Sequence, residues 1–182
     1  GVDISATALE GGWQLEGRGN YVLHAQNADV LIVIANTESG LAAYAGDPSD
    51  DAVQIEALPT LDRTLRIASV RFSGASAKQI NATRPVWEAV SQALNLALVA
   101  LAGEQAGGAK KVLDFTVEYA KTRIQFGRQI GSFQAIKHMA ADLLVETESA
   151  ISAARHAASS LADPSSHTHE AISLAAFACA DA

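Results

Sequence analysis

The sequence predicts an α+β protein, in which a small antiparallel β-sandwich or barrel precedes an up-down bundle of helices. Short apolar runs separated by glycine-rich and aspartate-rich turns fill the first part of the chain, which is typical of strands. In the remainder, apolar residues recur every three or four positions over long stretches, which is typical of helices. Hydrophobic residues make up 49% of the chain but aromatic residues only 5%. We therefore expect two domains, residues 1–80 and 81–182.

The first domain is expected to contain several short strands. The turn-rich segment Gly17-Arg18-Gly19-Asn20 contains residues that tolerate positive φ, so we expect it to connect the two strands of a hairpin. Val30 to Ala35 is a continuous apolar run, as in a buried strand. Arg66 to Phe72 alternates, as in a half-exposed strand. The strands expected are 4–9, 13–15, 21–23, 30–35, 41–45, 53–58 and 66–72.

The second domain is expected to begin near Asn81–Pro85, with Pro85 as the first residue of a long helix that ends near Gly127. A second helix is expected from 132 to 162, where Asp163-Pro164 ends it, and a third from about Ser166 to His169 onward. Small residues in the middle of the first helix suggest close approach of a neighbouring helix rather than a phosphate cradle. The expected apolar face of the first helix comprises Val90, Leu94, Leu98, Leu101, Val112, Phe115 and Tyr119, and that of the second comprises Ile136, Met139, Leu143, Thr147, Ile151, Ala154 and Ala158.

Composition excludes several classes of protein. The net charge of −7 provides no basic footprint for nucleic acid. No uninterrupted apolar run approaches the roughly 20 residues of a membrane span. The single cysteine, Cys179, rules out a disulfide framework and favours the reducing cytoplasm. His167 and His169 lie two apart, but no ligand set surrounds them, so we expect no metal site.

The segment Tyr119 to Gln134 carries the most specific chemistry. Arg123 is a permanent planar cation suited to phosphate. Phe126 is an aromatic beside Gly127, which we expect to end the helix. Gln134 supplies an amide about one turn into the next helix. A cation, a ring and an amide at a helix-to-helix corner suit a large phosphate-bearing cofactor, although such residues at an exposed corner are more often simply solvated.

The order of these residues resembles the start of the C-terminal helical domain of the acyl-CoA dehydrogenases. The matching positions are Tyr119, Ala120, Arg123, Gln125, Phe126, Gly127, Ile130, Gly131, Phe133 and Gln134. The earlier part of the chain resembles the end of the family's middle β-domain. The matches there are Gly11, Gly12, Trp13, Leu15, Gly17, Tyr21, Val22, Ala28, Asp29, Asp62, Arg63, Thr64, Val70 and Phe72. Gly1 is not a natural start, and we expect parts of both domains to lie outside this sequence.

The resemblance implies FAD-dependent α,β-dehydrogenation of an acyl-CoA thioester, in which a carboxylate removes the α-proton and hydride passes to the flavin. It implies that Arg123, Phe126 and Gln134 contact the diphosphate-adenosine half of an FAD that belongs largely to a partner subunit, with Gln125 a weaker addition. It further implies a dimer or a dimer of dimers, homomeric or heteromeric, and an electron-transfer flavoprotein as acceptor.

Departures from the family pattern leave alternatives open. The usual catalytic glutamate falls beyond Ala182, and the alternative position for the base falls on Ala97, so no catalytic residue is assigned. The acidic and basic positions that often face acyl-CoA fall on Asn95 and Leu98, and a flavin-contacting hydroxyl is replaced by Leu23. The protein is thus either part of a self-sufficient dehydrogenase or a non-catalytic subunit that completes a partner's FAD site in a mixed tetramer, as in bacterial relatives acting on bulky acyl-CoAs such as sterol side chains. A helical binding module without flavin is the third alternative.

Overall fold

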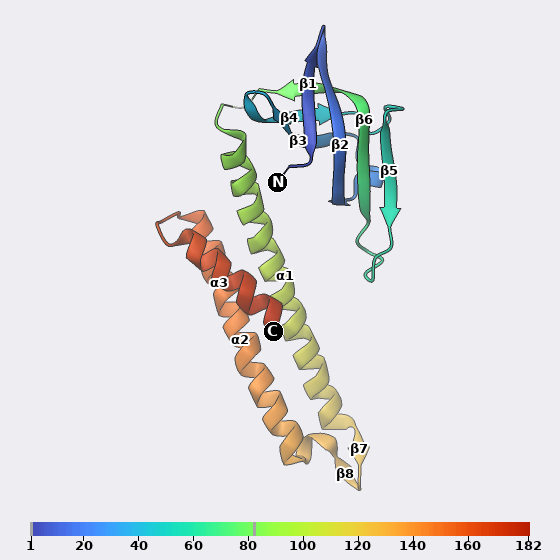
Figure 1. The fold of residues 1–182 in the computed structure, drawn as a ribbon. Coiled ribbons are helices and arrows are strands. Elements are labelled where there is room, and N and C mark those ends of the chain that lie inside the picture. Colours follow the sequence, from blue (N-terminus) through green and yellow to red (C-terminus); the bar gives the residue numbers. More distant parts are fainter. Residues whose placement is uncertain (1, 82) are drawn as a thin grey trace. The chain divides into compact units, whose positions relative to one another are not determined.

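The computed structural model describes residues 2–81 and 83–182, and the chain divides into two compact units, residues 1–89 and 90–182. Figure 1 shows a unit of strands followed by a unit of helices. The predicted α+β class is confirmed. The placement of a domain boundary after residue 80 stays a prediction, and Ala82, near the expected start of the second domain, lies outside the described residues.

The first unit is a closed sheet. Its strands are β1 (Ile4–Leu9), β2 (Gly12–Leu23), β3 (Leu31–Thr37), β4 (Gly40–Gly46), β5 (Val53–Leu58) and β6 (Ile67–Ile80). The strand order is β2-β1-β3-β4-β6-β5, and β2 also pairs with β6, which closes the ring and leaves β5 outside it. The strand pairings of this sheet are antiparallel except for the short β1–β3 contact, which is parallel. The expected antiparallel barrel is therefore antiparallel in all but one pairing.

Alternating side chains fill the barrel. Along β3, Leu31, Val33 and Ala35 are buried while the residues between them are more exposed. Leu15 and Tyr44 are fully buried. Strand β6 is longer than expected because it continues beyond Phe72 to pair with both β2 and β4.

The predicted hairpin turn at residues 17–20 is wrong, because β2 runs through it without a break. Gly17 has φ 131°, and a Cβ at this position would clash with the carbonyl oxygen of Asp3. The glycine therefore allows β1 to approach β2 closely, and the chain does not reverse there. Irregularities in the β2–β6 pairing between Leu15 and Glu16 and between Gly19 and Val22 absorb the extra residues.

The second unit consists mainly of three helices. These are α1 (Val86–Thr122), α2 (Gln134–Ala162) and α3 (Thr168–Asp181); between α1 and α2 lie β7 (Ile124–Gln125), β8 (Arg128–Gln129) and the 3-10 turn η2 (Ile130–Ser132). A further 3-10 turn, η1 (Ala25–Asn27), belongs to the first unit. The carbonyl of Pro85 accepts bonds from the backbone N–H groups of Glu88 and Ala89, so α1 begins one residue later than expected. The predicted end of α2 and start of α3 are confirmed.

Small side chains form the core of the helical unit. The buried residues that pack together are Ala102, Ala106, Ala150, Ala154, Ala157, Ile172, Ala175 and Cys179. The expected close approach of a second helix is therefore confirmed at Ala106. It is wrong for Gly103, Gly107 and Gly108, where a Cβ would meet nothing within 4 Å.

The face of α1 that was expected to be buried is exposed within this chain. Leu94, Leu101 and Phe115 are 53%, 47% and 71% exposed, whereas the packed face of α1 is formed by Ala102, Ala106, Leu113 and Ala120. On α2, Thr147 and Ala154 are buried as expected, but Met139 is exposed. The predicted packed face of α1 was wrong because it was assigned to the larger apolar residues, whereas closely packed helices favour alanine where they meet.

One helix is relevant to the expectation that no apolar run approaches a membrane span. By length and composition alone, α1 is long and apolar enough to cross a membrane, with a mean hydropathy of 1.3 over its most apolar 18 residues, a property that core helices of soluble proteins share. Polar residues such as Ser91 and Asn95 interrupt the helix, so it contains no uninterrupted apolar run of that length.

Candidate functional site

A short hairpin connects the two long helices. α1 ends at Thr122, and β7 pairs with β8 through Ile124 with Gln129 and Gln125 with Arg128. Phe126 and Gly127 form the two-residue turn, with φ angles of 53° and 75°. Such turns need positive φ at both central residues, which glycine adopts freely and phenylalanine does not. The prediction that Gly127 ends the helix is therefore wrong, and this glycine reverses the hairpin instead.

The base of the hairpin is fixed to the end of α1. The N–H of Arg123 donates to the carbonyl of Tyr119 at 2.9 Å, and the carbonyl of Arg123 accepts the N–H of Ile130 at 2.8 Å. Gly131 lies so close to α1 that a Cβ there would be 2.9 Å from the carbonyl oxygen of Ala120. These contacts hold the hairpin and η2 against the last turn of the helix.

The four residues expected to bind cofactor all lie on or beside this hairpin. Arg123 precedes β7, Gln125 lies in β7, Phe126 occupies the turn, and all three are exposed. Gln134 is also exposed, but it is the first residue of α2, so its expected place one turn inside the helix is wrong. The Gln125 side chain donates to the carbonyl of Ile124 at 3.0 Å. The structure brings these residues to one corner, and their role as ligands stays a prediction.

Phe126 at the turn and Arg128 on β8 both contact the ring of Phe133. The rings of Phe126 and Phe133 meet edge to face, with centroids 6.1 Å apart. The guanidinium carbon of Arg128 lies 4.0 Å from the centroid of Phe133. Sequence reasoning assigned no role to Arg128 or Phe133. No local pattern indicated these contacts, because they depend on the segment forming a hairpin.

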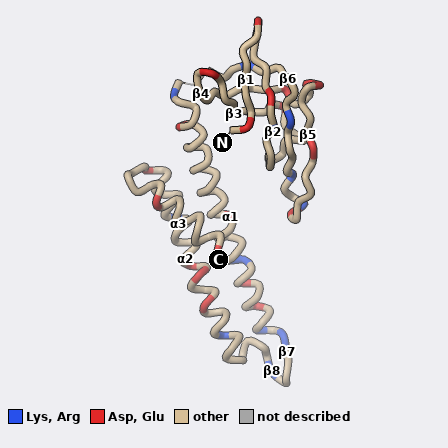
Figure 2. The backbone as a smooth tube through the Cα atoms, viewed as in Figure 1, with Lys and Arg blue, Asp and Glu red and all other residues tan. Residues whose placement is uncertain are grey.

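The corner is positively charged and has an apolar groove at its foot. Figure 2 shows basic positions gathered at the β7–β8 end of the helical unit. Among the nearby lysines, Lys121 is paired with Glu118 at 2.6 Å. The groove, about 340 Å³ in volume, is lined mainly by apolar residues of α1 and α2 and by Gly131. The hairpin itself, residues 123–134, contains no carboxylate.

This set of groups suits binding rather than proton transfer. A guanidinium recognises phosphate oxygens, an exposed ring provides a stacking face, and an amide can both donate and accept hydrogen bonds. The ring of Phe126 is 92% exposed. The backbone of this residue is also strained, because a bulky residue rarely adopts positive φ. The corner therefore fits a ligand with a flat ring system and an anionic group, and it lacks a general base.

The positions that depart from the family pattern lie on two elements. Leu23 is the last residue of β2 and is 60% exposed. It follows Tyr21, which has φ 59° at the irregularity in the β2–β6 pairing. Ala97 and Leu98 lie on exposed positions of α1. Asn95, also on α1, is half-buried, and none of the four positions 23, 95, 97 and 98 offers an ionisable side chain.

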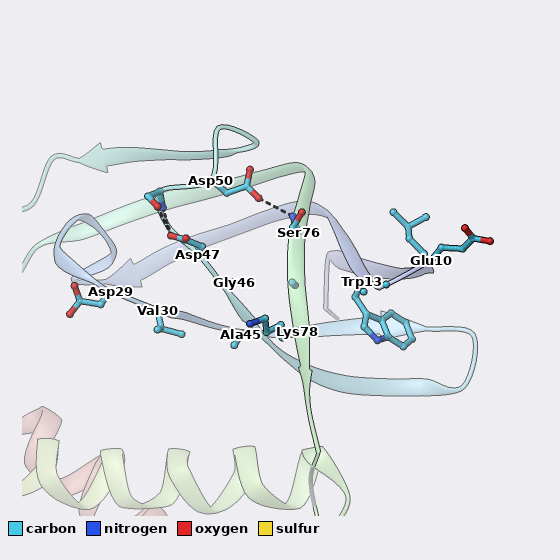
Figure 3. A pocket seen from close by; sticks show the side chains of 15 residues that line it. Glu10, Trp13, Asp29, Val30, Ala45, Gly46, Asp47, Asp50, Ser76 and Lys78 are labelled. Atoms are coloured by element: carbon cyan, nitrogen blue, oxygen red, sulfur yellow. Dashed lines mark hydrogen bonds between the residues drawn. The ribbon is translucent and has the colours of Figure 1, made fainter.

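A hollow of about 740 Å³ on the barrel contains several carboxylates (Figure 3). Asp47 accepts bonds from the N–H and hydroxyl of Ser49 at 2.8 and 2.6 Å, and these bonds lower the pKa of its carboxyl group. Asp50 accepts the N–H of Ala52 at 2.9 Å and that of Ser76 at 3.0 Å. Asp47 therefore stabilises its own turn, and Asp50 connects its turn to strand β6, so both carboxylates have structural roles.

The histidines of the second unit do not assemble a metal site in the described part of the chain, where no group of three His, Cys, Asp or Glu residues has the required geometry. His167 instead contacts Glu170, with Nδ1 and Oε2 3.0 Å apart. This pair lies in the first turn of α3 and is exposed.

Comparison with known proteins identifies the helical unit. Residues 87–182 match the model of the acyl-CoA dehydrogenase C-terminal domain. The chain is 39% identical over 126 residues to acyl-CoA dehydrogenase IpdE2 of Mycobacterium tuberculosis, covering 69% of this chain and 34% of that protein. It is 34% identical over 170 residues to acyl-CoA dehydrogenase FadE34 of the same organism, covering 90% and 22%. The chain thus spans about a third or less of these relatives.

Solved structures resemble the whole chain. The ChsE4-ChsE5 complex from Mycobacterium tuberculosis matches with a TM-score of 0.85 and 26% identity, covering 100% of this chain and 49% of that chain. A variant of the Tcur3481-Tcur3483 steroid ACAD matches with a TM-score of 0.78 and 27% identity, covering 97% and 47%. The family match covers more than half of the sequence and includes the entire hairpin corner. The chain belongs to the acyl-CoA dehydrogenase family.

Proposed function

We propose that this chain is part of a FAD-dependent acyl-CoA dehydrogenase, and that its hairpin corner binds the diphosphate-adenosine half of an FAD shared with a partner subunit. The observation that carries the proposal is the convergence of Arg123, Phe126 and Gln134 at one exposed corner that contains no carboxylate. FAD requires a cation for its diphosphate and a surface for its adenine, and the corner offers both.

Each residue has a distinct task. Arg123 directs a guanidinium at the diphosphate, where charge-assisted bonds contribute most. Phe126 presents its ring to the flat adenine, and Gln134 bonds a polar edge of the adenosine from the start of α2. Gln125 contributes less, because its amide already donates to the carbonyl of Ile124. When bound, FAD supplies the two-electron acceptor for oxidation of the acyl-CoA.

The assembly proposed is a cytoplasmic dimer or dimer of dimers, with acyl-CoA as substrate and an electron-transfer flavoprotein as acceptor. The exposure of the corner leaves room for another subunit to lie against the bound cofactor. The α-proton must be removed by a carboxylate that does not belong to the hairpin or to positions 95, 97 and 98 of α1.

A second candidate is a non-catalytic subunit that completes the FAD site of a catalytic partner. The specific observation is the joint loss of ionisable or hydroxyl groups at Leu23, Asn95, Ala97 and Leu98. The likeness to a complex of two different named chains, ChsE4 and ChsE5, supports a mixed assembly. In this case the corner retains its binding function while the chain contributes no group to proton transfer.

The test is a visible spectrum of the complete protein, purified alone and after co-expression with its neighbouring gene products, followed by anaerobic addition of acyl-CoA. A flavin band in the protein alone that bleaches on addition supports a self-sufficient dehydrogenase. A band that appears only with a partner supports the mixed assembly. No band in either sample would overturn the FAD proposal and leave a helical binding module as the function.

A matched pair of variants tests the corner itself. Arg123→Gln removes the proposed phosphate contact and is expected to weaken FAD binding by about ten- to a hundredfold, since a hydrogen bond to a charged group is worth roughly 1.5–3 kcal/mol. Arg155→Gln makes the same change at an exposed position of α2 and is expected to leave the affinity unchanged. Equal affinities for the two variants would contradict the assignment of Arg123.

A further inference from the structure

We propose that Arg128 is a positioning residue, which orders the exposed Phe126 ring by way of Phe133 and does not itself bind the cofactor. This inference rests on the proposed function of the corner, and it separates the roles of the two arginines of the hairpin. Arg123 binds the anionic part of the ligand. Arg128 restricts the conformations of the Phe126 ring.

The first step of the inference concerns the direction of the Arg128 side chain. Its guanidinium carbon lies 4.0 Å from the centroid of Phe133, well inside the roughly 6 Å range of a cation–π contact. The guanidinium therefore covers one face of a half-buried ring. An arginine engaged in this way has part of its binding surface occupied within its own chain.

The second step concerns the ring that Arg128 covers. Phe133 is the N-cap residue of α2, so its backbone is held by the start of the helix. Its ring meets that of Phe126 at an interplanar angle of 90° with centroids 6.1 Å apart, a favourable edge-to-face arrangement. Arg128, Phe133 and Phe126 therefore form a continuous series of side-chain contacts, here called the aromatic stack.

The third step concerns why Phe126 needs support. It is 92% exposed and adopts φ 53°, which a bulky residue rarely adopts. The described contacts of its ring are therefore few, and the Phe133 ring is the one aromatic contact recorded for it among the described residues. An unsupported ring would lose rotamer freedom on binding, so prior ordering by the stack lowers the cost of binding.

Arg128→Leu is expected to weaken FAD binding by about two- to fivefold, the range of an exposed cation–π contact. The loss should depend less on ionic strength than the larger loss in Arg123→Gln, which should shrink at high salt. Arg128→Lys keeps a cation above the ring and should restore most of the affinity. The matched control is Arg155→Leu, the same change at an exposed position of α2.

The experiment measures FAD affinity by flavin fluorescence in the complete protein with its assembly partners, as a cycle of single and double variants. If Arg128 acts through the aromatic stack, adding Arg128→Leu to Phe133→Leu costs no further affinity. If the two losses add, Arg128 contacts the cofactor directly and the proposal is overturned. Thermal unfolding of each variant confirms that the fold is kept.

A second measurement makes the outcome independent of FAD. With 4-fluorophenylalanine at position 126, the ¹⁹F resonance of the free protein should shift and narrow in Arg128→Leu, because the ring loses its fixed place against Phe133 and gains motion, and should remain in place in Arg155→Leu. If the protein binds no FAD but the resonance moves, the proposed function fails and the stack stands. An unmoved resonance in Arg128→Leu overturns the positioning role, whether or not FAD binds.

Discussion

Substituting alanine for Gly131 tests the most crowded contact at the functional corner. A Cβ at this position would lie 2.9 Å from the carbonyl oxygen and 3.2 Å from the carbonyl carbon of Ala120. Both atoms are backbone near the end of α1, so they cannot rotate away as a side chain would. Gly131 is absent from the glycines with positive φ, so the effect of the substitution is steric rather than conformational.

The size of the effect follows from the cost of overpacking. Forcing an extra methyl group into a filled site costs about 1–3 kcal/mol. For a chain of this length, that corresponds to a fall of roughly 3–9 °C in Tm. Because η2 must move away from α1, the variant should also weaken FAD binding by displacing the hairpin relative to Gln134.

Gly108→Ala is the matched control. Gly108 lies inside α1, and a Cβ there meets nothing within 4 Å. Alanine is better than glycine in a helix by about 0.8–1 kcal/mol, so this variant should be more stable than the wild type. Thermal unfolding followed by circular dichroism at 222 nm measures both. The steric argument is refuted if Gly131→Ala is as stable as the wild type, or if the two variants shift in the same direction.

Three further substitutions or reactions test other features. Tyr44→Phe should raise the free energy of unfolding by about 1 kcal/mol, because the Tyr44 hydroxyl is buried without a hydrogen-bond partner among the described residues. Burial raises the pKa of Tyr44 above 10.0, the ordinary pKa of a tyrosine, so the wild type should lose stability as the pH rises above 10.0. Denaturant titrations at alkaline pH should show no such loss from position 44 in Tyr44→Phe. Thr168→Val should lower the unfolding free energy by about 1–2 kcal/mol in urea titrations, since its hydroxyl accepts the N–H of Ser165 and donates to the carbonyl of Ser160, while Ser173→Ala should change little. Burial raises the pKa of the Cys179 thiol, whose Sγ lies 3.3 Å from the Ala150 carbonyl oxygen. A thiol reagent at pH 8 should therefore label Cys179 slowly in the folded protein and rapidly in denaturant. Equal labelling rates would contradict the burial of Cys179.

The sequence predicted the order of elements well. The prediction failed where a glycine is compatible with more than one backbone geometry, and where large apolar residues were expected to be buried in preference to small ones. Gly17 and Gly127 were expected to mark a turn and a helix end. The first instead allows close approach of β1, and the second forms a two-residue hairpin turn. A single glycine permits all of these geometries, and for Gly17 the outcome depends on how β2 pairs with β1, which local propensity does not indicate.

The candidate site was predictable in its members but not in its internal contacts. Arg123, Phe126 and Gln134 fall within a short segment, so their proximity followed from sequence. The contact of Arg128 with Phe133 depends on the hairpin, which local propensity did not indicate in a segment between two helices. Likewise, the packed face of α1 depends on alanines whose burial is decided by the neighbouring helices, while the larger leucines attract a pattern-based prediction.

The alanine core of the helical unit has a calorimetric consequence. Each buried alanine removes little more than one methyl group from water, while large side chains such as Leu94, Phe115 and Phe177 remain hydrated within this chain. The heat capacity of unfolding grows with the apolar area exposed, so folding of these helices alone should contribute little of it. Any association that covers the large side chains should therefore have a strongly negative heat-capacity change. The magnitude of that change should exceed the magnitude of the heat-capacity change for folding the helices themselves.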